Sequence, residues 1–398
     1  MRFPVRFVSV IAAAAMAVCP LSTSPVPADA AEILTMSQFI SPEYQVRICS
    51  DTDEAAVYLR KQMTQKADII YFSLPSLLFS GEDTVSEVMS KALAETGVST
   101  EGDYLRLSLK SYASYWGESG NTMVIRLNID YITDTEQEAE LTEKLGEVMA
   151  SLNLDGRSDY QKALIIYDYV TQNVDYPTAS GWEVSSAYSA LVNKTAVCQG
   201  FAQLIYRMFT EAGIKCRFVG GSSNGVMHAW NIAYIDGAYY YIDATWDSMT
   251  LGRRLFFLKG TKDLDEYIYN GQNGHDTDPA FEEFNPIYEM YGTDDFLLRF
   301  PLSDVKYDPA DPVPAYLPGD VDNDKTLDPA DASQILRAYS YFINTDYEVF
   351  TLSQRNAADV SGDGVIDSSD ASIILSYYSE TANGSDISFE DYLKTLQQ

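Results

Sequence analysis

In the middle of this chain, the fold is set by the segment Ala196-Val-Cys-Gln-Gly-Phe-Ala-Gln-Leu-Ile-Tyr-Arg-Met-Phe209. Its apolar residues recur at the spacing of a helix with one buried face, and Gly213 provides a stop after it. We therefore expect Cys198 to open a buried helix. The N-terminus of a helix carries partial positive charge and unpaired amide protons, which stabilise a thiolate and can hold an oxyanion.

Two predicted strands follow this helix. Residues 228–234 alternate between apolar and polar side chains, and residues 238–246 alternate again. Between them, Asp236-Gly237 is a dipeptide typical of a two-residue hairpin turn. The sequence therefore predicts an antiparallel hairpin.

The hairpin would bring a histidine and a carboxylate onto one face. If Ile235 pairs with Ala238, then His228 lies opposite Thr245 and diagonal to Asp243. A carboxylate on a diagonal cross-strand neighbour can reach one ring nitrogen and leave the other free. Such an arrangement orients an imidazole as a base.

Together these segments resemble the transglutaminase-like branch of the papain-related superfamily. The matching motifs are Ala-Val-Cys-Gln-Gly-Phe-Ala, Val219-Gly-Gly, His228-Ala-Trp-Asn and Tyr241-Ile-Asp-Ala-Thr-Trp-Asp247, within a resemblance that spans about residues 156–300. It implies that Cys198 is the nucleophile, His228 the general base and acid, and Asp243 the orienting carboxylate of an acyl-transfer site. The second oxyanion donor is not assigned, and Tyr188 and the Gln199 side chain are both candidates.

The same three residues serve more than one reaction. We expect a cysteine peptidase or amidase that cleaves a protein or peptide substrate, with no cofactor for catalysis. In a protein cross-linking transamidase, an amine such as lysine would replace water. A third alternative is a catalytically idle transglutaminase-like binding module in a polysaccharide-degrading complex. The sequence does not choose between hydrolysis and transamidation.

The C-terminal region contains a repeat. Asp331-Ala-Ser-Gln-Ile-Leu-Arg-Ala-Tyr339 returns 39 residues later as Asp370-Ala-Ser-Ile-Ile-Leu-Ser-Tyr-Tyr378, with six of nine positions identical, and an acidic loop precedes each copy. Oxygens at loop positions 1, 3, 5, 7, 9 and 12 suit Ca²⁺, which takes six to eight oxygen ligands. The expected ligands are Asp320, Asp322, Asp324, the Thr326 carbonyl, Asp328 and Asp331 in the first loop, and Asp359, Ser361, Asp363, the Val365 carbonyl, Asp367 and Asp370 in the second.

The repeat resembles a type I dockerin over about residues 317–380. Position 12 is Asp in both loops, and Pro318-Gly319 leaves no room for a helix entering the first loop. The resemblance implies a small all-α module that needs structural calcium at two sites in order to fold, and that binds a cohesin module on a scaffolding protein. Two residues depart from the pattern: Lys325 stands where the turn favours Gly, and Ser361 replaces a charged ligand.

The N-terminus predicts export. Arg2 and Arg6 precede an apolar run over residues 7–19, and Ala28-Asp-Ala30 follows as a small-residue cleavage site. The run is shorter than the roughly 20 residues that a membrane-spanning helix needs. We therefore expect an extracellular, scaffold-bound protein with no membrane attachment after cleavage, in a cellulosome-like assembly.

The expected fold class is α+β, with an N-terminal α+β domain, a papain-like or transglutaminase-like α+β core and a small all-α dockerin. In the N-terminal domain, residues 55–66 and 84–94 are predicted helices, and residues 104–114 and 122–132 predicted strands. Five of the 15 prolines lie between 301 and 318, which is typical of a spacer. The predicted boundaries are a signal peptide at 1–30, the N-terminal domain at 31–155, the transglutaminase-like domain at 156–300, a linker at 301–318, the dockerin at 319–383 and a C-terminal tail at 384–398.

Charge and cysteine content limit the partners. The chain has 58 acidic against 27 Lys and Arg residues, a net charge of −31, so nucleic acid is excluded as an expected partner, because its binding relies on clustered basic side chains. After removal of the leader only Cys49, Cys198 and Cys216 remain, too few for a disulfide framework. Cys49 and Cys216 are expected to be buried free thiols, with a disulfide between them as the alternative.

Overall fold

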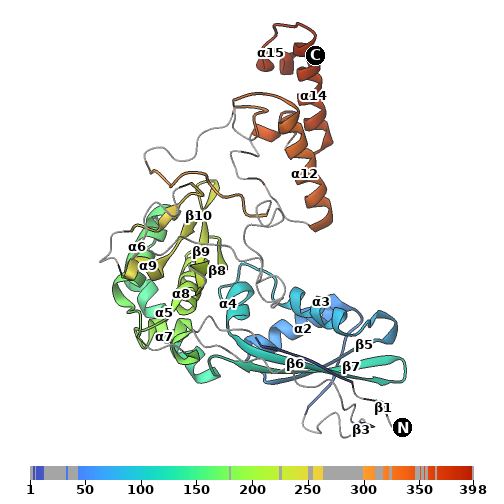
Figure 1. The fold of residues 1–398 in the computed structure, drawn as a ribbon, viewed down its shortest axis with the longest axis vertical. Helices are drawn as coiled ribbons and strands as arrows, with labels where there is room; N and C mark the ends of the chain where they lie inside the picture. The colour runs from blue at the N-terminus through green and yellow to red at the C-terminus, as the bar shows by residue number, and fades with distance from the viewer. Residues whose placement is uncertain are drawn as a thin grey trace. The chain divides into compact units, whose positions relative to one another are not determined.

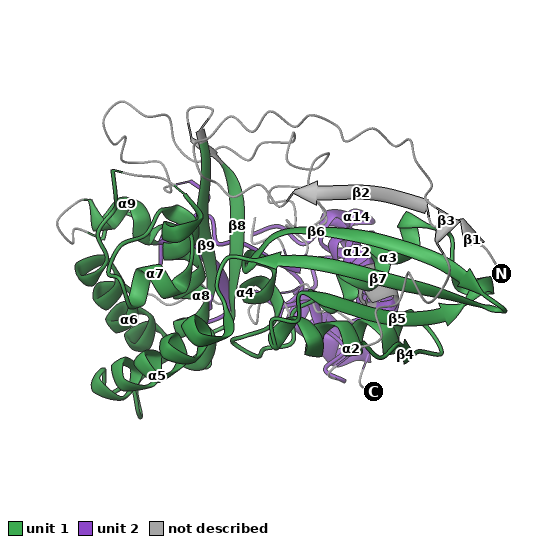
Figure 2. Ribbon diagram, turned by 90° about the horizontal axis from the view of Figure 1, so that it is seen from below, with its two compact units in different colours: residues 1–233, 242–257, 265–290 green, residues 234–241, 258–264, 291–398 purple. Residues whose placement is uncertain are grey.

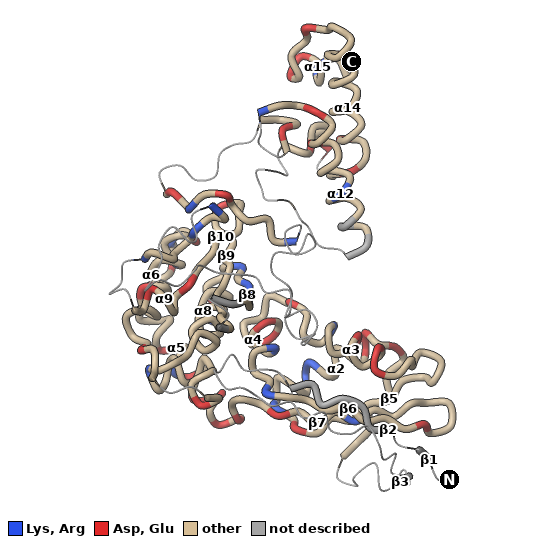
Figure 3. Tube along the Cα trace, viewed as in Figure 1, with Lys and Arg blue, Asp and Glu red and all other residues tan. Residues whose placement is uncertain are grey.

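The computed structural model describes two compact units. It covers residues 3–4, 6–12, 33–34, 44–178, 181–223, 226–249, 254–262, 299–309, 317–321, 325–345, 350, 354, 357–363 and 365–396. Unit 1 comprises residues 1–233, 242–257 and 265–290, and unit 2 comprises residues 234–241, 258–264 and 291–398 (Figure 2). Asp and Glu positions are distributed along the backbone of the described residues (Figure 3). The α+β fold class is confirmed.

The N-terminal part of unit 1 is a five-stranded sheet with two helices along one face (Figure 1). Its strand order is β2-β6-β7-β5-β4, and β4 is parallel to β5 while the other pairs are antiparallel. A further short pair joins β1 (Phe3–Pro4) to β3 (Ile33–Leu34). The elements are β2 (Arg6–Ala12), β4 (Arg47–Ile48), α2 (Thr52–Thr64), β5 (Ile69–Pro75), η1 (Ser76–Leu78), α3 (Glu82–Ala92), β6 (Leu109–Ser119) and β7 (Thr122–Tyr131).

Side-chain alternation explains this layer. Ile125, Leu127 and Ile129 on β7 are buried in the core with residues of α2 and α3, such as Leu59 and Val88. Their neighbours in β7 point to the other face, as expected from the two-residue period of a strand. The two predicted helices and the strand at 122–132 are therefore confirmed, with ends shifted by a few residues.

The expectation of a strand from residue 104 is wrong at its beginning. Helix α4 (Gly102–Leu107) occupies this stretch, and β6 begins only at Leu109. The Asp103 carboxylate accepts hydrogen bonds from Arg217 Nε and from the Phe218 amide, both at 2.8 Å. These partners lie more than a hundred residues away in sequence, so a tertiary contact overrides the local pattern.

Strand β2 lies within the segment that we expect to be removed on export. It pairs with β6 from Arg6↔Trp116 to Ala12↔Ser111. Cleavage at the predicted site would leave β6 as an edge strand of the sheet. The export signal itself stays a prediction.

The second part of the α+β structure is built around α8 (Cys198–Glu211). The elements are α5 (Thr135–Ser151), α6 (Asp159–Asn173), η2 (Trp182–Val184), α7 (Ala187–Leu191), β8 (Cys216–Ser223), β9 (Val226–Ile235), β10 (Ala238–Ile242), α9 (Ala244–Ser248) and β11 (Phe257–Lys259), with strand order β11-β10-β9-β8. Every residue of α8 from Cys198 to Phe209 is buried, which confirms the predicted helix.

Gly200 allows the first turn of α8 to pack closely. A Cβ at this position would lie 2.8 Å from the Ala196 Cβ and 2.9 Å from the Ser186 carbonyl oxygen. The adjacent Ala187 amide donates to Gln203 Oε1 at 2.7 Å. The backbone before α7 therefore rests directly on the helix that Cys198 opens.

The predicted hairpin is confirmed at its turn and wrong at its far end. Asp236 and Gly237 both have positive φ, 46° and 102°, as the predicted two-residue turn requires. The second strand, however, stops at Ile242, and the helix α9 follows. Asp243 caps α9 by accepting from the Thr245 and Trp246 amides, so capping ends the strand where alternation alone predicted its continuation.

In unit 2, the first half of the predicted linker is ordered against strands. The Tyr239 amide donates to the Pro301 carbonyl at 3.1 Å, and the Ser303 amide donates to the Tyr239 carbonyl at 2.9 Å. The Thr261 amide bonds the Ser303 carbonyl in turn. Residues 301–309 thus extend β-type pairing rather than forming a free spacer, and residues 310–316 lie outside the described residues.

Among its described residues, the C-terminal part of unit 2 contains the helices α12 (Pro329–Thr345), α14 (Ser368–Ala382) and α15 (Phe389–Leu396). Its small core includes Val321, Ile335 and Ile374, with Phe389 packed against it. The segment expected to be a tail therefore contributes a packed helix. None of the helices in the described part of the chain combines the length and the apolarity that crossing a bilayer requires.

Candidate active site

Cys198 lies at the start of α8, in a closely held backbone. Its side chain is 3% exposed and belongs to a cluster with Leu107, Phe218 and Ala229. The preceding Val197 amide donates to the Val184 carbonyl at 2.8 Å. The thiol is thus fixed at the end of the helix where the backbone amides have no intrahelical partner.

His228 and Asp243 form a direct contact. Nε2 of the His228 ring lies 2.6 Å from Oδ2 of Asp243, and both side chains are buried. Asp243 Oδ1 accepts the Thr245 amide at 2.8 Å and the Trp246 amide at 3.1 Å, which leaves Oδ2 for the ring. The expected approach of carboxylate to imidazole is found, although a helix cap produces it rather than an extended strand pair.

Two indoles hold the imidazole ring. The ring of Trp246 is stacked on His228 with centroids 5.1 Å apart, and the ring of Trp230 with centroids 5.7 Å apart. Trp246 in turn packs edge-on against Phe256. These contacts fix the ring plane, so only its two nitrogen atoms are available for directed interactions.

The environment of His228 favours the protonated ring. Burial by itself lowers the pKa of His228, but the charge of Asp243 and hydrogen bonds to Asp243 and to the Cys198 thiol raise this pKa to about 10. Because Nε2 faces Asp243, Nδ1 is the nitrogen left for the thiol. The ring therefore connects the sulfur of Cys198 to the carboxylate, the relation on which the proposed chemistry depends.

The first acidic loop of unit 2 contains a carboxylate that needs a further ligand. Asp320 is fully buried; its Oδ2 accepts the Lys325 amide at 3.1 Å, while its Oδ1 has no hydrogen-bond partner. A buried carboxylate oxygen without a partner is costly, and a calcium ion would satisfy it. Asp322 and Asp324 lie outside the described residues.

Position 12 braces the two loops in the same way. Asp331 accepts the Val321 and Asp328 amides at 2.7 and 3.0 Å. Asp370 accepts the Ser361 and Asp367 amides, both at 3.0 Å. Asp328, Asp359, Asp363 and Asp367 also accept loop amides. Within the described ranges no three His, Cys, Asp or Glu side chains converge as a metal site would require, so the ligand set stays a prediction.

Two family models match this chain, one over the region of the candidate catalytic site and one over the acidic loops. A model of the transglutaminase-like superfamily matches residues 148–244, and a model of the dockerin type I domain matches residues 318–377. The chain carries a transglutaminase-like domain and a type I dockerin. Type I dockerin domains bind calcium structurally, and a dockerin implies binding to a cohesin and an extracellular, cellulosome-type protein.

Individual relatives match only parts of the chain. Kyphoscoliosis peptidase from Homo sapiens is 27% identical over 128 residues, which is 28% of this chain and 19% of that protein. The Mus musculus protein of the same name is 27% identical over 120 residues, 26% of this chain and 18% of that protein. The matched stretch thus spans about a fifth of the curated relatives.

Solved structures show low overall similarity. One is a TGase with a TM-score of 0.27 and 14% identity, covering 54% of this chain and 61% of that chain. Another is a putative cysteine protease from Cytophaga hutchinsonii with a TM-score of 0.24 and 22% identity, covering 32% of this chain and 55% of that chain.

Sequence reasoning missed a supporting layer of the transglutaminase-like domain. The Tyr167 hydroxyl, on α6, lies 2.5 Å from Asp247 Oδ2 and 2.9 Å from the Asp243 carbonyl oxygen. Asp247 also accepts the Leu255 and Phe256 amides. This network fixes α9 and with it Asp243. The helical spacing of Asp243 and Asp247 is a signal in the sequence, but the alternation over residues 238–246 predicts a strand there.

Both sequence candidates for the second oxyanion donor have another hydrogen-bond partner. The Gln199 amide nitrogen donates to the Leu107 carbonyl at 3.0 Å. The Tyr188 hydroxyl donates to Glu140 Oε2 at 2.8 Å on an exposed surface. The bond of Gln199 connects the helix to α4 of the N-terminal part.

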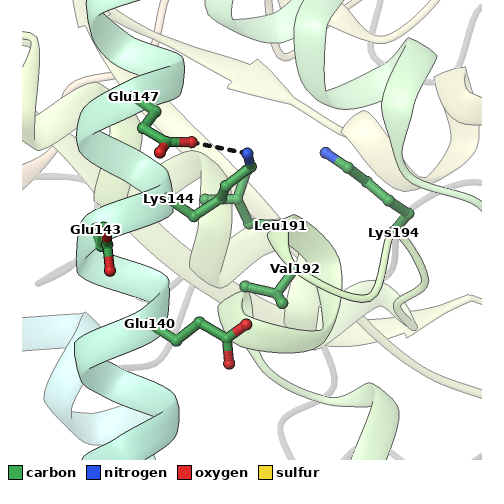
Figure 4. A pocket seen from close by; sticks show the side chains of 7 residues that line it. All are labelled: Glu140, Glu143, Lys144, Glu147, Leu191, Val192 and Lys194. Atoms are coloured by element: carbon green, nitrogen blue, oxygen red, sulfur yellow. Dashed lines mark hydrogen bonds and ion pairs between the residues drawn. The ribbon is translucent and has the colours of Figure 1, made fainter.

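A cavity of about 350 Å³ lies elsewhere in unit 1, between α5 and the end of α7 (Figure 4). It is lined by Glu140, Glu143, Lys144, Glu147, Leu191, Val192 and Lys194. Lys144 donates to Glu147 at 2.8 Å across its rim. None of the three residues predicted to be catalytic lines this cavity.

The other cysteines take no part in the site. Cys49 and Cys216 are buried and, like Cys198, are free thiols. Burial raises the pKa of both thiols above the ordinary value. Both side chains therefore remain neutral, as expected for thiols in the core, and no disulfide joins them.

Proposed function

We propose that this protein is a secreted cysteine-dependent acyl-transfer enzyme of the peptidase or amidase type, attached to a cohesin-bearing scaffold by its dockerin. Cys198 is the nucleophile, His228 the general base and acid, and Asp243 the carboxylate that orients the ring. The contact of His228 with Asp243 at 2.6 Å, in a ring that also bonds the Cys198 thiol, is the observation that supports this proposal most directly.

The reaction follows from the positions of these groups. The sulfur of Cys198 attacks the carbonyl carbon of an amide, forming a C–S bond, and His228 gives its Nδ1 proton to the nitrogen as the C–N bond breaks. Water then attacks the thioester and loses a proton to His228 as the C–S bond breaks. Asp243 stays ionised and stabilises the imidazolium at each step.

No cofactor is required for these steps. Calcium belongs to the dockerin, where we propose Asp320, Asp322, Asp324, Asp328 and Asp331 with the Thr326 carbonyl as ligands of the first ion. Asp359, Ser361, Asp363, Asp367 and Asp370 with the Val365 carbonyl would hold the second. Calcium there neutralises acidic loops that otherwise repel each other, so that the module folds and presents its helices to a cohesin.

The test is a comparison of products. Wild type, Cys198→Ser and Asp243→Asn are incubated with a peptide library and with peptidoglycan, and the products are identified by mass spectrometry. We expect new carboxyl termini or free acids that only the wild type forms. Identical products from wild type and Cys198→Ser would exclude the proposed enzyme.

The same experiment decides between hydrolysis and transamidation. A primary amine added at millimolar concentration is incorporated into products by a transamidase, with amine-dependent ammonia release from glutamine. A hydrolase gives the same products with and without amine. Labelling by iodoacetamide tests the third alternative, a catalytically idle binding module. In such a module, Cys198 would react no faster than a free thiol at pH 7.

A further inference from the structure

The proposed reaction needs donors for the negative oxygen that forms when sulfur adds to a carbonyl. The Cys198 and Gln199 amides at the start of α8 provide one source, because the first amides of a helix lack intrahelical partners. A second donor has to come from a side chain near Cys198. The Gln199 and Tyr188 side chains donate instead to the Leu107 carbonyl and to Glu140.

Tyr176 is held beside the backbone that leads to Cys198. Asp175 forms a parallel β-bridge with Thr195. In this bridge the Asp175 amide donates to the Lys194 carbonyl at 2.9 Å, and the Ala196 amide donates to the Asp175 carbonyl at 3.1 Å. Tyr176 is thus the next residue after a segment that is fixed two to four residues before the sulfur.

The sequence around Tyr176 also restricts its backbone. Pro177 follows directly, and a residue before proline is confined to extended conformations. Val174, on the other side, is buried. The backbone of Tyr176 is therefore restricted on both sides, which suits a donor that acts without reorganisation.

The phenol has the right electrostatic position and exposure. Burial, with smaller contributions from the negative charges of Cys198 and Asp243, raises the pKa of Tyr176 to about 12, so the hydroxyl stays a donor at ordinary pH. Tyr176 is 44% exposed, whereas Cys198 is 3% and His228 6% exposed. The Tyr176 side chain is therefore accessible to a substrate, whereas the sulfur and the imidazole are buried.

We propose that the Tyr176 hydroxyl is the second oxyanion donor of the site, and that it acts together with the first-turn amides of α8. This inference rests on the proposed function. As the C–S bond forms, the carbonyl π electrons move to oxygen, which accepts hydrogen bonds from Tyr176 and the helix. When the leaving group departs, the carbonyl is restored and no proton is exchanged with Tyr176.

Two probes of Cys198 separate this role from others. p-Nitrophenyl acetate acylates the thiol through a tetrahedral intermediate and releases p-nitrophenolate in a burst. Iodoacetamide alkylates the same sulfur by displacement of iodide, with no oxyanion. For Tyr176→Phe we expect the acylation rate to fall about 10²-fold, or about 2.7 kcal/mol. The alkylation rate should stay within about twofold, because it depends on Cys198 and His228 alone.

Tyr188→Phe is the matched control, because it removes the same oxygen from a tyrosine that bonds Glu140 on the surface. It should leave both rates unchanged. Tyr176→Ala and Tyr176→Phe should lose acylation equally if the hydroxyl is the active feature. A wild-type acylation rate in Tyr176→Phe would overturn the inference, as would an equal loss of acylation and alkylation.

The outcomes also separate the inference from the proposed function. A burst that survives in Cys198→Ala, or is absent in wild type, refutes the proposed enzyme and the inference together. A burst that depends on Cys198 but is indifferent to Tyr176→Phe refutes only the role of Tyr176. The deficit of Tyr176→Phe should stay constant between pH 6 and 9, because the hydroxyl does not titrate there.

Discussion

Replacing Asp243 by Asn tests the electrostatics of the site directly. In the native structure the pKa of His228 is about 10, against about 6.5 for an unperturbed ring, a difference of about 5 kcal/mol in favour of the charged form. Burial opposes this shift, and the charge of Asp243 is its first cause. Without that charge, burial prevails, and the pKa of His228 should fall to 6.5 or below.

The assay is an NMR titration of histidine. The chain has only two histidines, so one variant, His275→Gln, assigns both resonances. We expect the His228 signal to titrate near pH 10 in wild type and below about 6.5 in Asp243→Asn, with acyl-transfer activity reduced by on the order of 10² to 10⁴. Asp168→Asn, which removes a carboxylate bonded to Arg254, should change neither.

The pH dependence of stability follows with a definite sign. Because the folded pKa of His228 is raised, its contribution to the free energy of unfolding is complete below about pH 6.5 and is lost as the pH rises to about 10. Asp243→Asn should remove this slope. The reasoning is refuted if Asp243→Asn retains a His228 midpoint above pH 9, or if wild type titrates near 6.5.

Three further changes have expected outcomes. Gly200→Ala should lower the free energy of unfolding by about 1 to 3 kcal/mol in thermal or urea denaturation, because its Cβ would meet atoms at 2.8 and 2.9 Å. Gly146→Ala is the control: a Cβ there has nothing within 4 Å, so the substitution should raise the free energy of unfolding by up to about 1 kcal/mol. Chelation of calcium should unfold the dockerin and abolish cohesin capture without changing the melting of the transglutaminase-like domain, and Asp320→Ala should weaken calcium binding at least roughly tenfold in calorimetry. Burial and the neighbouring Asp103 raise the pKa of Glu95 to about 7. The free energy of unfolding should therefore fall by about 3 kcal/mol as the pH rises from about 4.5 to 7. Glu95→Gln should remove this fall in a pH series of denaturation curves.

Each of the three predictions would be contradicted by a specific result. Equal effects of the two glycine substitutions would show that packing at Gly200 is not tight. Cohesin capture that survives chelation would exclude calcium as a structural ion of the dockerin. A stability profile of Glu95→Gln that parallels wild type between pH 4.5 and 7 would show that this carboxyl is not the titrating group.

The candidate site illustrates what a pattern in the sequence can and cannot predict. The apolar period after Cys198 and the Asp236-Gly237 turn are local signals, and both are confirmed. The residue at which the second strand ends is not determined by such a local signal. Asp243 stops it by capping α9, and Tyr167, from a helix some 76 residues earlier, fixes that cap. Alternation alone could not distinguish a continuing strand from a cap.

The sequence by itself determined the helix that presents Cys198, the type of residues in the site and the two acidic loops with their common helix, because each depends on spacing within a short segment. Tertiary structure alone decided which groups meet. It turned Gln199 toward Leu107, made a helix of residues that alternate like a strand at α4, and bridged Asp175 to Thr195. The physical reason is that hydrogen bonds and burial between distant segments outweigh local propensities, which amount to about 1 kcal/mol or less per residue.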